Sequence, residues 1–243
     1  MTFGIIGFGR FGKLWASALA PYGHVLVYDK NEIENKSEFG GLDFVGLEEV
    51  VKVDMLFLLV PISEMKNCCL EIKSLLNSNT VVIDACSVKV YPSKIMQEVL
   101  SDKQPIIATH PLFGPDSATH HGLGGHKIVV CPIRSTKEQK KVLIGLFNDF
   151  GLEIIEATPD EHDLQMARSQ ALVHFIGRGL TELNLQEQAI STPDYASLLA
   201  VNSMVQNDTW QLFFDMQKFN PYTKDIRDKF VQGLKKIEDK IKQ

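Results

Sequence analysis

Three short segments of the sequence combine residue types that could do chemistry on a small polar molecule. The first, "GIIGFGRFG" (residues 4–12), carries three glycines at the G-x-G-x-x-G spacing that allows a backbone to approach a pyrophosphate closely. The second, "DACSVK" (84–89), offers a serine and a lysine. The third, "ATHPLFGPDSA" (108–118), holds a histidine among two prolines and a glycine. Together these groups could bind a phosphorylated cofactor and move a proton.

The glycine segment predicts a dinucleotide site because of the elements around it. Gly7, Gly9 and Gly12 directly follow the apolar run Thr2–Ile6, which we expect to be a strand. They directly precede a helical pattern over Phe11–Ala20, and this order of elements makes the motif specific. The N-terminus of that helix would stabilise the phosphate charge.

An acidic residue at the expected distance favours NAD, with NADP less favoured. Asp29 follows the predicted strand His24–Tyr28, where a carboxylate accepts a hydrogen bond from a ribose 2′-hydroxyl and repels a 2′-phosphate. Lys30 could soften that discrimination, and Arg10 either touches the pyrophosphate or is solvated. The alternative interpretation is a glycine turn beside a surface aspartate. The residues expected to contact the cofactor are Gly7, Gly9, Arg10, Phe11, Gly12, Asp29, Val60, Pro61 and Ser87.

Short apolar runs alternate with amphipathic stretches up to about residue 156, which predicts a doubly wound (Rossmann-type), mainly parallel sheet. The predicted strands are Thr2–Ile6, His24–Tyr28, Met55–Val60, Thr80–Ile83, Pro105–Thr109, Lys127–Cys131 and Leu152–Glu156. The predicted helices between them are Phe11–Ala20, Glu64–Leu76, Val90–Leu100 and Lys137–Phe150. We therefore expect a dinucleotide-binding domain over residues 1–156 and a smaller all-helical domain, for substrate binding and dimerisation, over residues 157–243.

Ligands of such sheets bind outside the carboxyl ends of the strands. Val60 and Pro61 end one predicted strand, Ser87 follows another, and His110 follows a third in a rigid turn. His110 is either a base, since an imidazole pKa of about 6.5 suits proton acceptance near neutral pH, or a histidine that only bonds loop carbonyls. Ser87 faces the crevice, caps the following helix, or does both.

The segment beyond the boundary predicts one helix from its N-cap, Thr158, to about Gln188, and then two further helices. At 100° per residue, four polar side chains of the first helix share a stripe about 80° wide: Asp163, Gln170, His174 and Arg178. We expect this stripe to face the crevice, with a purely structural histidine as the alternative for His174.

With these residues the chain resembles the prephenate and arogenate dehydrogenase family. The segments "DACSVK" (84–89), "HPLFGPD" (110–116) and "EHDLQMARSQALVHF" (161–175) look like its signature segments, in the same order after a G-x-G-x-x-G. The resemblance extends from Gly4 to about Arg178. It implies NAD-dependent oxidative decarboxylation of a cyclohexadienol carboxylate in tyrosine biosynthesis, with no fused chorismate mutase or regulatory domain expected.

The resemblance also implies roles for individual residues of the first domain. His110 would accept the proton of the substrate hydroxyl, and Ser87 would hydrogen-bond that hydroxyl or His110. Lys89 is a candidate partner for a substrate carboxylate, and the alternative is a solvated lysine. A homodimer through the helical domain is expected from the family and from the apolar faces of the helices.

In the helical region the resemblance is partial. Gln170 and His174 match family positions that line the substrate pocket, and His162 matches a cofactor- or fold-related position. Family members usually carry an arginine that binds a substrate carboxylate in bidentate fashion, but the corresponding residue here is Ser203. We expect Arg178, one turn beyond His174, to replace it. The alternatives are a different substrate or a lost activity.

The composition argues against two other classes of protein, those that bind nucleic acid and those that span a membrane. A net charge of −5 without a basic cluster argues against nucleic-acid binding, and no stretch approaches the ~20 apolar residues that would span a membrane. Four cysteines without C-x-x-C spacing suggest reduced thiols in a cytoplasmic protein, and no metal site is expected.

The sequence does not distinguish prephenate from arogenate as the substrate. The alternatives are a dehydrogenase of another small hydroxy acid and a non-catalytic NAD-binding protein.

Overall fold

The computed structural model describes the backbone of all 243 residues and the side chains of residues 1–118 and 122–243. The chain divides into two compact units, Met1–Pro159 and Asp160–Gln243. The division therefore falls after residue 159, whereas the sequence pattern placed it after residue 156.

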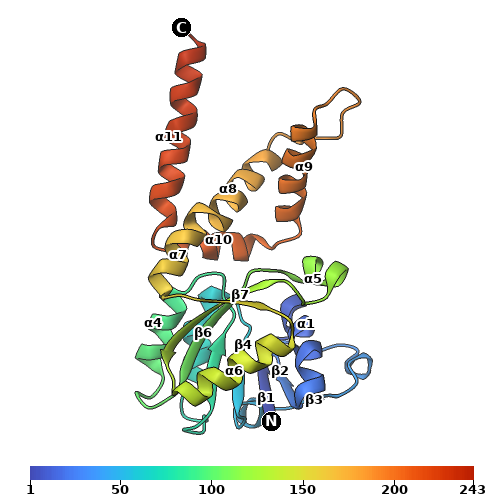
Figure 1. Cartoon of the computed structure of the whole chain (residues 1–243), viewed down its shortest axis with the longest axis vertical. Coiled ribbons are helices and arrows are strands. Elements are labelled where there is room, and N and C mark those ends of the chain that lie inside the picture. The colour runs from blue at the N-terminus through green and yellow to red at the C-terminus, as the bar shows by residue number, and fades with distance from the viewer. The chain divides into compact units, whose positions relative to one another are not determined.

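The first unit is built on one eight-stranded sheet, shown in Figure 1, in the order β3-β2-β1-β4-β5-β6-β7-β8. Its strands are β1 (Thr2–Ile6), β2 (His24–Tyr28), β3 (Leu42–Phe44), β4 (Met55–Leu58), β5 (Val81–Asp84), β6 (Ile106–Pro111), β7 (Lys127–Arg134) and β8 (Glu153–Glu156). Neighbouring strands pair in parallel except β6 and β7, which are antiparallel. The predicted doubly wound, mainly parallel sheet is confirmed. The strand order reverses between β1 and β4, which is where such sheets bind ligands.

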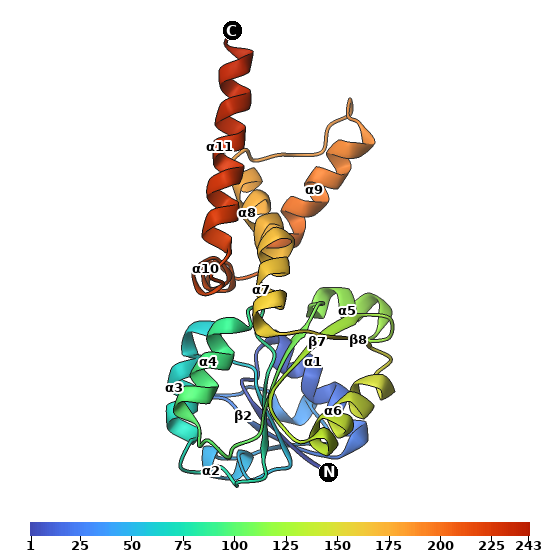
Figure 2. The ribbon, with the colours of Figure 1, turned by 60° about the vertical axis from the view of Figure 1, so that its left-hand side comes forward.

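Helices cover both faces of this sheet. They are α1 (Arg10–Leu19), α2 (Leu47–Val50), α3 (Met65–Ile72), α4 (Val90–Val99), α5 (Pro115–His121) and α6 (Lys137–Asp149), with 3₁₀ turns at Ala20–Tyr22, Lys36–Glu38 and Ile62–Glu64. In Figure 2, α3 and α4 lie together on one face, while α1 and α6 lie on the other. β3, α2 and α5 are additions to the predicted elements.

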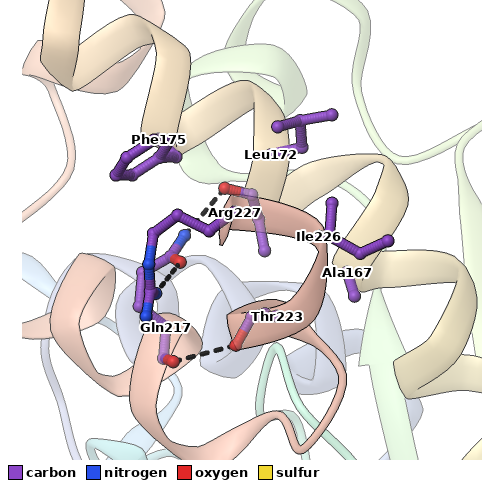
Figure 3. Close-up of a pocket in the computed structure, with 8 residues that line it drawn as sticks. Ala167, Leu172, Phe175, Gln217, Thr223, Ile226 and Arg227 are labelled. Atoms are coloured by element: carbon purple, nitrogen blue, oxygen red, sulfur yellow. Dashed lines mark hydrogen bonds between the residues drawn. The ribbon is translucent and has the colours of Figure 1, made fainter. Parts of the chain in front are cut away.

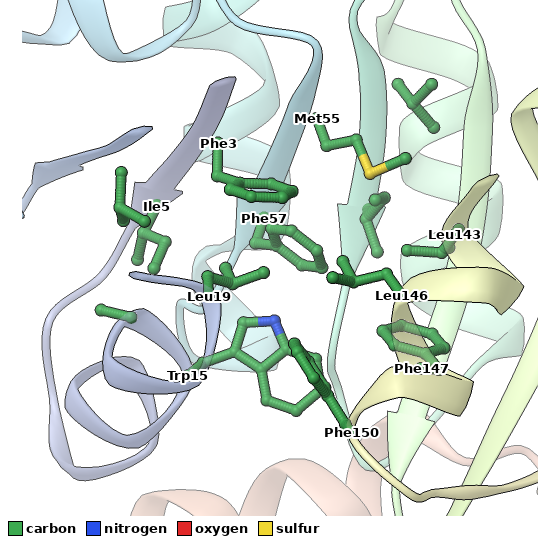
Figure 4. Packing of buried hydrophobic residues seen from close by; sticks show 14 of the residues in the cluster. Phe3, Ile5, Trp15, Leu19, Met55, Phe57, Leu143, Leu146, Phe147 and Phe150 are labelled. Carbon is green, nitrogen blue, oxygen red and sulfur yellow. The ribbon is translucent and has the colours of Figure 1, made fainter. Parts of the chain in front are cut away.

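Aromatic packing fixes α1 and α6 against the sheet (Figure 4). Trp15 of α1 is fully buried, and its ring lies 5.9 Å from the rings of both Phe57 on β4 and Phe147 on α6. Burying large aromatic side chains contributes ~1.5–3 kcal/mol each, so this cluster anchors the helix that follows the glycine segment. The glycine segment is thereby held between a buried strand and a rigid helix.

The second unit contains α8 (Gln170–Thr181), α9 (Pro193–Gln206), α10 (Trp210–Phe219), α11 (Thr223–Ile241) and all but the first residue of α7 (Pro159–Arg168). The predicted single helix to Gln188 is wrong, because Ser169 interrupts it with a ψ of −88°. The Ser169 hydroxyl donates to the carbonyl of Gln165 at 2.8 Å, and such back-bonding bends helices. α10 was not predicted. Among the described residues, no helix is long and apolar enough to cross a membrane.

Candidate functional site

The glycine segment forms a tight turn that the fold itself requires. Gly7 has a φ of +103°, and a Cβ there would lie 2.3 Å from the carbonyl oxygen of Leu59. A Cβ at Gly12 would lie 2.1 Å from the carbonyl oxygen of Gly7. Val60 and Pro61 follow β4 directly beside this turn, since the Leu59 N–H donates to the Ile6 carbonyl at 2.7 Å. The turn and the end of β4 therefore meet at the switch point of the sheet.

Gly9 differs from Gly7 and Gly12 because a Cβ placed on it would meet no atom of the described residues within 4 Å. It occupies the N-cap of α1 with a φ of −70°, and glycine has no side chain that could cap the first N–H groups of the helix. An open cradle at a helix N-terminus fits a pyrophosphate. Packing against the described residues therefore does not explain a glycine at this position, whereas close approach of a pyrophosphate would.

We expect Gly9→Ala to raise the dissociation constant for NAD at least about tenfold and to leave the melting temperature unchanged, because the added methyl group would meet only the ligand. Calorimetric titration and thermal unfolding measure the two effects. Gly46→Ala is the matched control, since Gly46 is also an N-cap in extended conformation with open space around it. Equal NAD affinity in the two variants would contradict the cradle.

Asp29 supports the turn and borders a cavity of about 270 Å³ at the ends of β2 and β3. One of its carboxylate oxygens accepts from the Phe8 N–H at 2.7 Å, and the other accepts from the Asn31 N–H at 2.8 Å. The Lys30 ammonium lies 3.5 Å from the Glu64 carboxylate, which offsets its charge. The cavity is lined by residues 27–33 together with Lys36, Phe44 and Val45. Its position suits the adenosine half of a dinucleotide.

Arg10 and Phe11 connect the glycine segment to the "HPLFGPD" segment. The Arg10 guanidinium forms an ion pair with Asp116, and both side chains are more than half exposed. Phe11 stacks on Trp15 with 5.4 Å between ring centroids and lies 6.4 Å from the ring of Phe113. Asp116 was not predicted as a site residue, and its only sequence signal was its place in the signature segment.

The ends of two neighbouring strands carry Ser87 and His110. β5 and β6 are parallel and pair Asp84 with Ala108, so Ser87, beyond the end of β5, and His110, near the end of β6, are both at the carboxyl edge of the sheet. His110 lies within β6 opposite Val129 and is 3% exposed, so the predicted placement in a turn is wrong: the strand ladder includes it. Ser87 is half-buried. It does not cap α4, whose N-cap position is Lys89, so that alternative is also wrong.

Lys89 is neither solvated nor open to a substrate. Its side chain is 0% exposed, and the ammonium donates to the carboxylate of Asp84 and to the backbone carbonyl of Thr109. Both predicted interpretations of Lys89 are therefore corrected. A buried lysine needs such partners, because an unpaired charge in the interior carries a large desolvation cost.

Three polar side chains of the predicted stripe do share one face of α8, at intervals of four residues. Each has a buried polar atom that makes no hydrogen bond to the described residues: Gln170 Oε1, His174 Nδ1 and Arg178 Nε. Buried polar atoms are normally satisfied, so three unsatisfied atoms in a row suit a polar ligand. Asp163 lies on α7, before the break at Ser169, and does not belong to this face.

Two residues that follow α9 complete this cluster: Asp208, between α9 and α10, and Trp210, the first residue of α10. The Arg178 guanidinium donates to the backbone carbonyl of Asp208 and lies 4.3 Å from the ring centroid of Trp210. His174 Nε2 lies 3.7 Å from the Asp208 carboxylate. The sequence analysis predicted a role for neither Asp208 nor Trp210, and the only sequence signal for them is that they follow Ser203 closely.

Burial lowers the pKa of His174 below 6.5; the nearby Arg178 guanidinium lowers it further, while Asp208 opposes the shift. As the pH falls below 6.5, this histidine becomes protonated in the unfolded chain but stays neutral in the native protein. Protonation therefore favours the unfolded state, and the free energy of unfolding decreases. We expect His174→Gln to reduce this loss of stability between neutral pH and about pH 5. Urea unfolding of the two proteins across that range tests it, and identical pH slopes would contradict it.

His162 and Asp163 form a buried pair at the start of the second unit. The Nδ1 of His162 lies 2.7 Å from the Asp163 carboxylate, with both side chains 0% exposed. The side chain of Asn220 donates to the Asp163 carbonyl at 2.8 Å and ties the end of α10 to α7. These contacts support the fold-related interpretation of His162.

A small pocket between the helices, shown in Figure 3, contains none of the predicted residues. Its polar groups satisfy one another: Arg227 donates to the Gln217 side chain at 2.8 Å, and Gln217 donates to the Ala171 carbonyl at 2.8 Å. Arg227 also lies 5.9 Å from the ring of Phe175. The pocket therefore represents packing between helices.

Ser203, at the position where the family usually carries an arginine, lies on α9 and is exposed.

Comparison with known proteins agrees with this architecture. The profile "Prephenate dehydrogenase, nucleotide-binding domain" matches residues 16–156, and "TYRAAT1-like, C-terminal domain" matches residues 179–243. The chain is 26% identical to arogenate dehydrogenase 1 (chloroplastic) of Arabidopsis thaliana over 253 residues, covering 99% of this chain and 39% of that protein. It is 26% identical to a probable arogenate/prephenate dehydrogenase of Methanocaldococcus jannaschii over 257 residues, covering 100% of this chain and 57% of that protein.

A solved structure shows the same fold. Prephenate dehydrogenase from A. aeolicus, in complex with hydroxyphenyl propionate and NAD⁺, superposes with a TM-score of 0.80 at 18% identity, covering 99% of this chain and 90% of that one. The doubly wound sheet and its glycine cradle place the first unit among Rossmann-type nucleotide-binding domains. The family profile goes further: the chain belongs to the prephenate dehydrogenase family. It spans about two fifths and about three fifths of the two relatives named above.

Proposed function

We propose that this protein catalyses the NAD-dependent oxidative decarboxylation of prephenate or arogenate. The observation that carries the proposal is the placement of Ser87 and His110 at the carboxyl edge of the neighbouring strands β5 and β6, in the sheet whose switch point holds the glycine cradle. The named relatives and the NAD⁺ complex of the A. aeolicus enzyme support it.

In the proposed reaction, residues of the first unit accept a proton, hydrogen-bond the substrate and hold the cofactor. His110 accepts the proton of the substrate hydroxyl while the carbinol carbon loses a hydride, and Ser87 hydrogen-bonds the same oxygen. The bond between the ring and its carboxylate breaks, carbon dioxide leaves, and the electron pair of that bond makes the ring aromatic. The former hydroxyl oxygen is then a phenolate, which takes the proton back from His110. NAD, when bound, is the hydride acceptor. Gly7, Gly9 and Gly12 hold its pyrophosphate, and Asp29 holds its ribose.

The second unit supplies the groups that bind the substrate. Arg178 meets a carboxylate, while Gln170 and His174 hydrogen-bond the polar parts of the ring and side chain. Support comes from the buried, unsatisfied atom that each of these side chains directs along one face of α8. A carboxylate and a hydroxyl would satisfy such atoms.

One assay tests the proposal. Purified protein is mixed with NAD and either prephenate or arogenate, and NADH absorbance is followed. Turnover of one substrate supports the proposal. Turnover of another small hydroxy acid alone would favour a related dehydrogenase with a different substrate. That alternative follows from Ser203, which stands where the family usually carries a substrate-binding arginine. NAD binding without turnover of any of them would favour a non-catalytic NAD-binding protein.

We further propose that the protein is a homodimer through its helical unit. Apolar side chains on one face of α11 stand in solvent: Leu234, Ile237 and Ile241 are 52%, 57% and 79% exposed. Burying such a stripe against a second copy would stabilise a small helical unit. Gel filtration showing a monomer at micromolar concentration would contradict this.

A further inference from the structure

A buried ion pair lies directly behind the strand end that carries His110. The side chains of Lys89 and Asp84 are both 0% exposed. The Lys89 ammonium donates to the Asp84 carboxylate and also to the backbone carbonyl of Thr109. Since Thr109 directly precedes His110, Lys89 contacts the peptide unit from which the histidine projects.

Asp84 joins the same two strand ends through further hydrogen bonds. Its carboxylate accepts from the Cys86 N–H at 3.0 Å and from the Thr109 N–H at 3.3 Å. The Thr109 hydroxyl donates to the Asp84 carbonyl at 2.6 Å. These contacts tie the segment that carries Ser87 to the strand that carries His110.

We propose that Lys89 and Asp84 are positioning residues, which fix His110 relative to Ser87 without touching the substrate. The proposal rests on the function proposed above. An apolar pair could fill the same volume with a smaller desolvation cost, but it could not make directional bonds to both strand ends. Precise placement matters here, because a displacement of about 1 Å at a catalytic group lowers a rate about a hundredfold.

The alternative role for Lys89, binding a substrate carboxylate, has a different kinetic signature. Losing a substrate ligand raises KM, whereas losing a positioning residue lowers kcat. We expect Lys89→Met to lower kcat about ten- to a hundredfold while KM and the Kd of NAD stay within about twofold. Lys94→Met is the control, because Lys94 lies on the same helix with its side chain 69% exposed and should leave kcat unchanged. A raised KM with unchanged kcat would overturn the proposal.

A second variant separates positioning from stability. Lys89→Met alone leaves the Asp84 carboxylate buried without its cation, so the melting temperature should fall. The double variant Asp84→Asn/Lys89→Met removes both charges and should recover much of that loss, but its kcat should stay low. Counting only active protein, by titrating NAD-binding sites, keeps unfolded chains out of the comparison. Recovery of kcat together with stability would show a merely structural pair and overturn the proposal.

A third measurement does not depend on the proposed reaction. The ring signals of His110 in the NAD-loaded protein, identified by their loss in His110→Gln, should shift in Lys89→Met and in the double variant but not in Lys94→Met. Absence of wild-type turnover with these shifts present would contradict the proposed function alone. Unchanged His110 signals in both Lys89 variants would overturn the positioning role alone.

Discussion

Replacing His110 with glutamine should lower kcat by about a hundred- to ten-thousandfold and leave the Kd of NAD unchanged. A positioned general base contributes a factor of that size, and glutamine cannot accept a proton at neutral pH. The fold should tolerate the change, because the sheet ladder between β6 and β7 holds this backbone position. Steady-state kinetics with the accepted substrate and calorimetric titration of NAD measure the two quantities.

His24→Gln is the matched control for this experiment. His24 begins β2 at the amino edge of the sheet, opposite the site, and its side chain is 55% exposed. The control should keep the wild-type kcat. A kcat within tenfold of the wild type for His110→Gln would remove His110 from the role of base and leave it as a buried strand residue.

Local patterns were sufficient for much of the sheet. β1 and β2 have the bounds that their continuous apolar runs predict, and Gly7 ends the first of them. β3, by contrast, has only the three residues Leu42–Phe44, and it is a strand because it pairs with β2. Such pairing depends on residues distant in sequence, which local hydrophobicity does not report.

The same limit explains the corrections at the site. His110 was expected in a turn because prolines and a glycine surround it, yet pairing with β7 keeps it in the strand. Lys89 was expected either to bind a substrate carboxylate or to be solvated, yet it is buried against Asp84 and the Thr109 carbonyl, although lysines rarely lie fully inside. An aspartate at the end of an apolar strand, five residues before a lysine, was the signal available for this pair.

The predicted stripe on the helical segment was partly right for a related reason. Gln170, His174 and Arg178 lie on one helix, so the 100° rule holds for them. It fails for Asp163, because the rule assumes a continuous helix and the backbone of Ser169 breaks this one. A serine within a long helical pattern gives only a weak sequence signal for such a break.

Replacing Arg178 with alanine should raise the substrate KM at least about tenfold, with a smaller effect on kcat. A charge-assisted hydrogen bond contributes ~1.5–3 kcal/mol, which corresponds to a factor of about 10 to 150 in affinity. Arg178 as a whole residue is 8% exposed, its Nη2 donates to the Asp208 carbonyl, and its Nε is buried without a partner among the described residues. A substrate carboxylate would satisfy that remaining donor.

Arg227→Ala distinguishes this role from helix packing. Arg227 belongs to the same unit and makes the same two kinds of contact, a hydrogen bond to an acceptor oxygen on Gln217 and a position near an aromatic ring, that of Phe175. If Arg178 only packed its helices, both variants would lose stability and keep the wild-type KM. If it binds the carboxylate, only Arg178→Ala changes KM, and its loss of affinity shrinks as ionic strength rises, since added salt weakens the wild-type attraction.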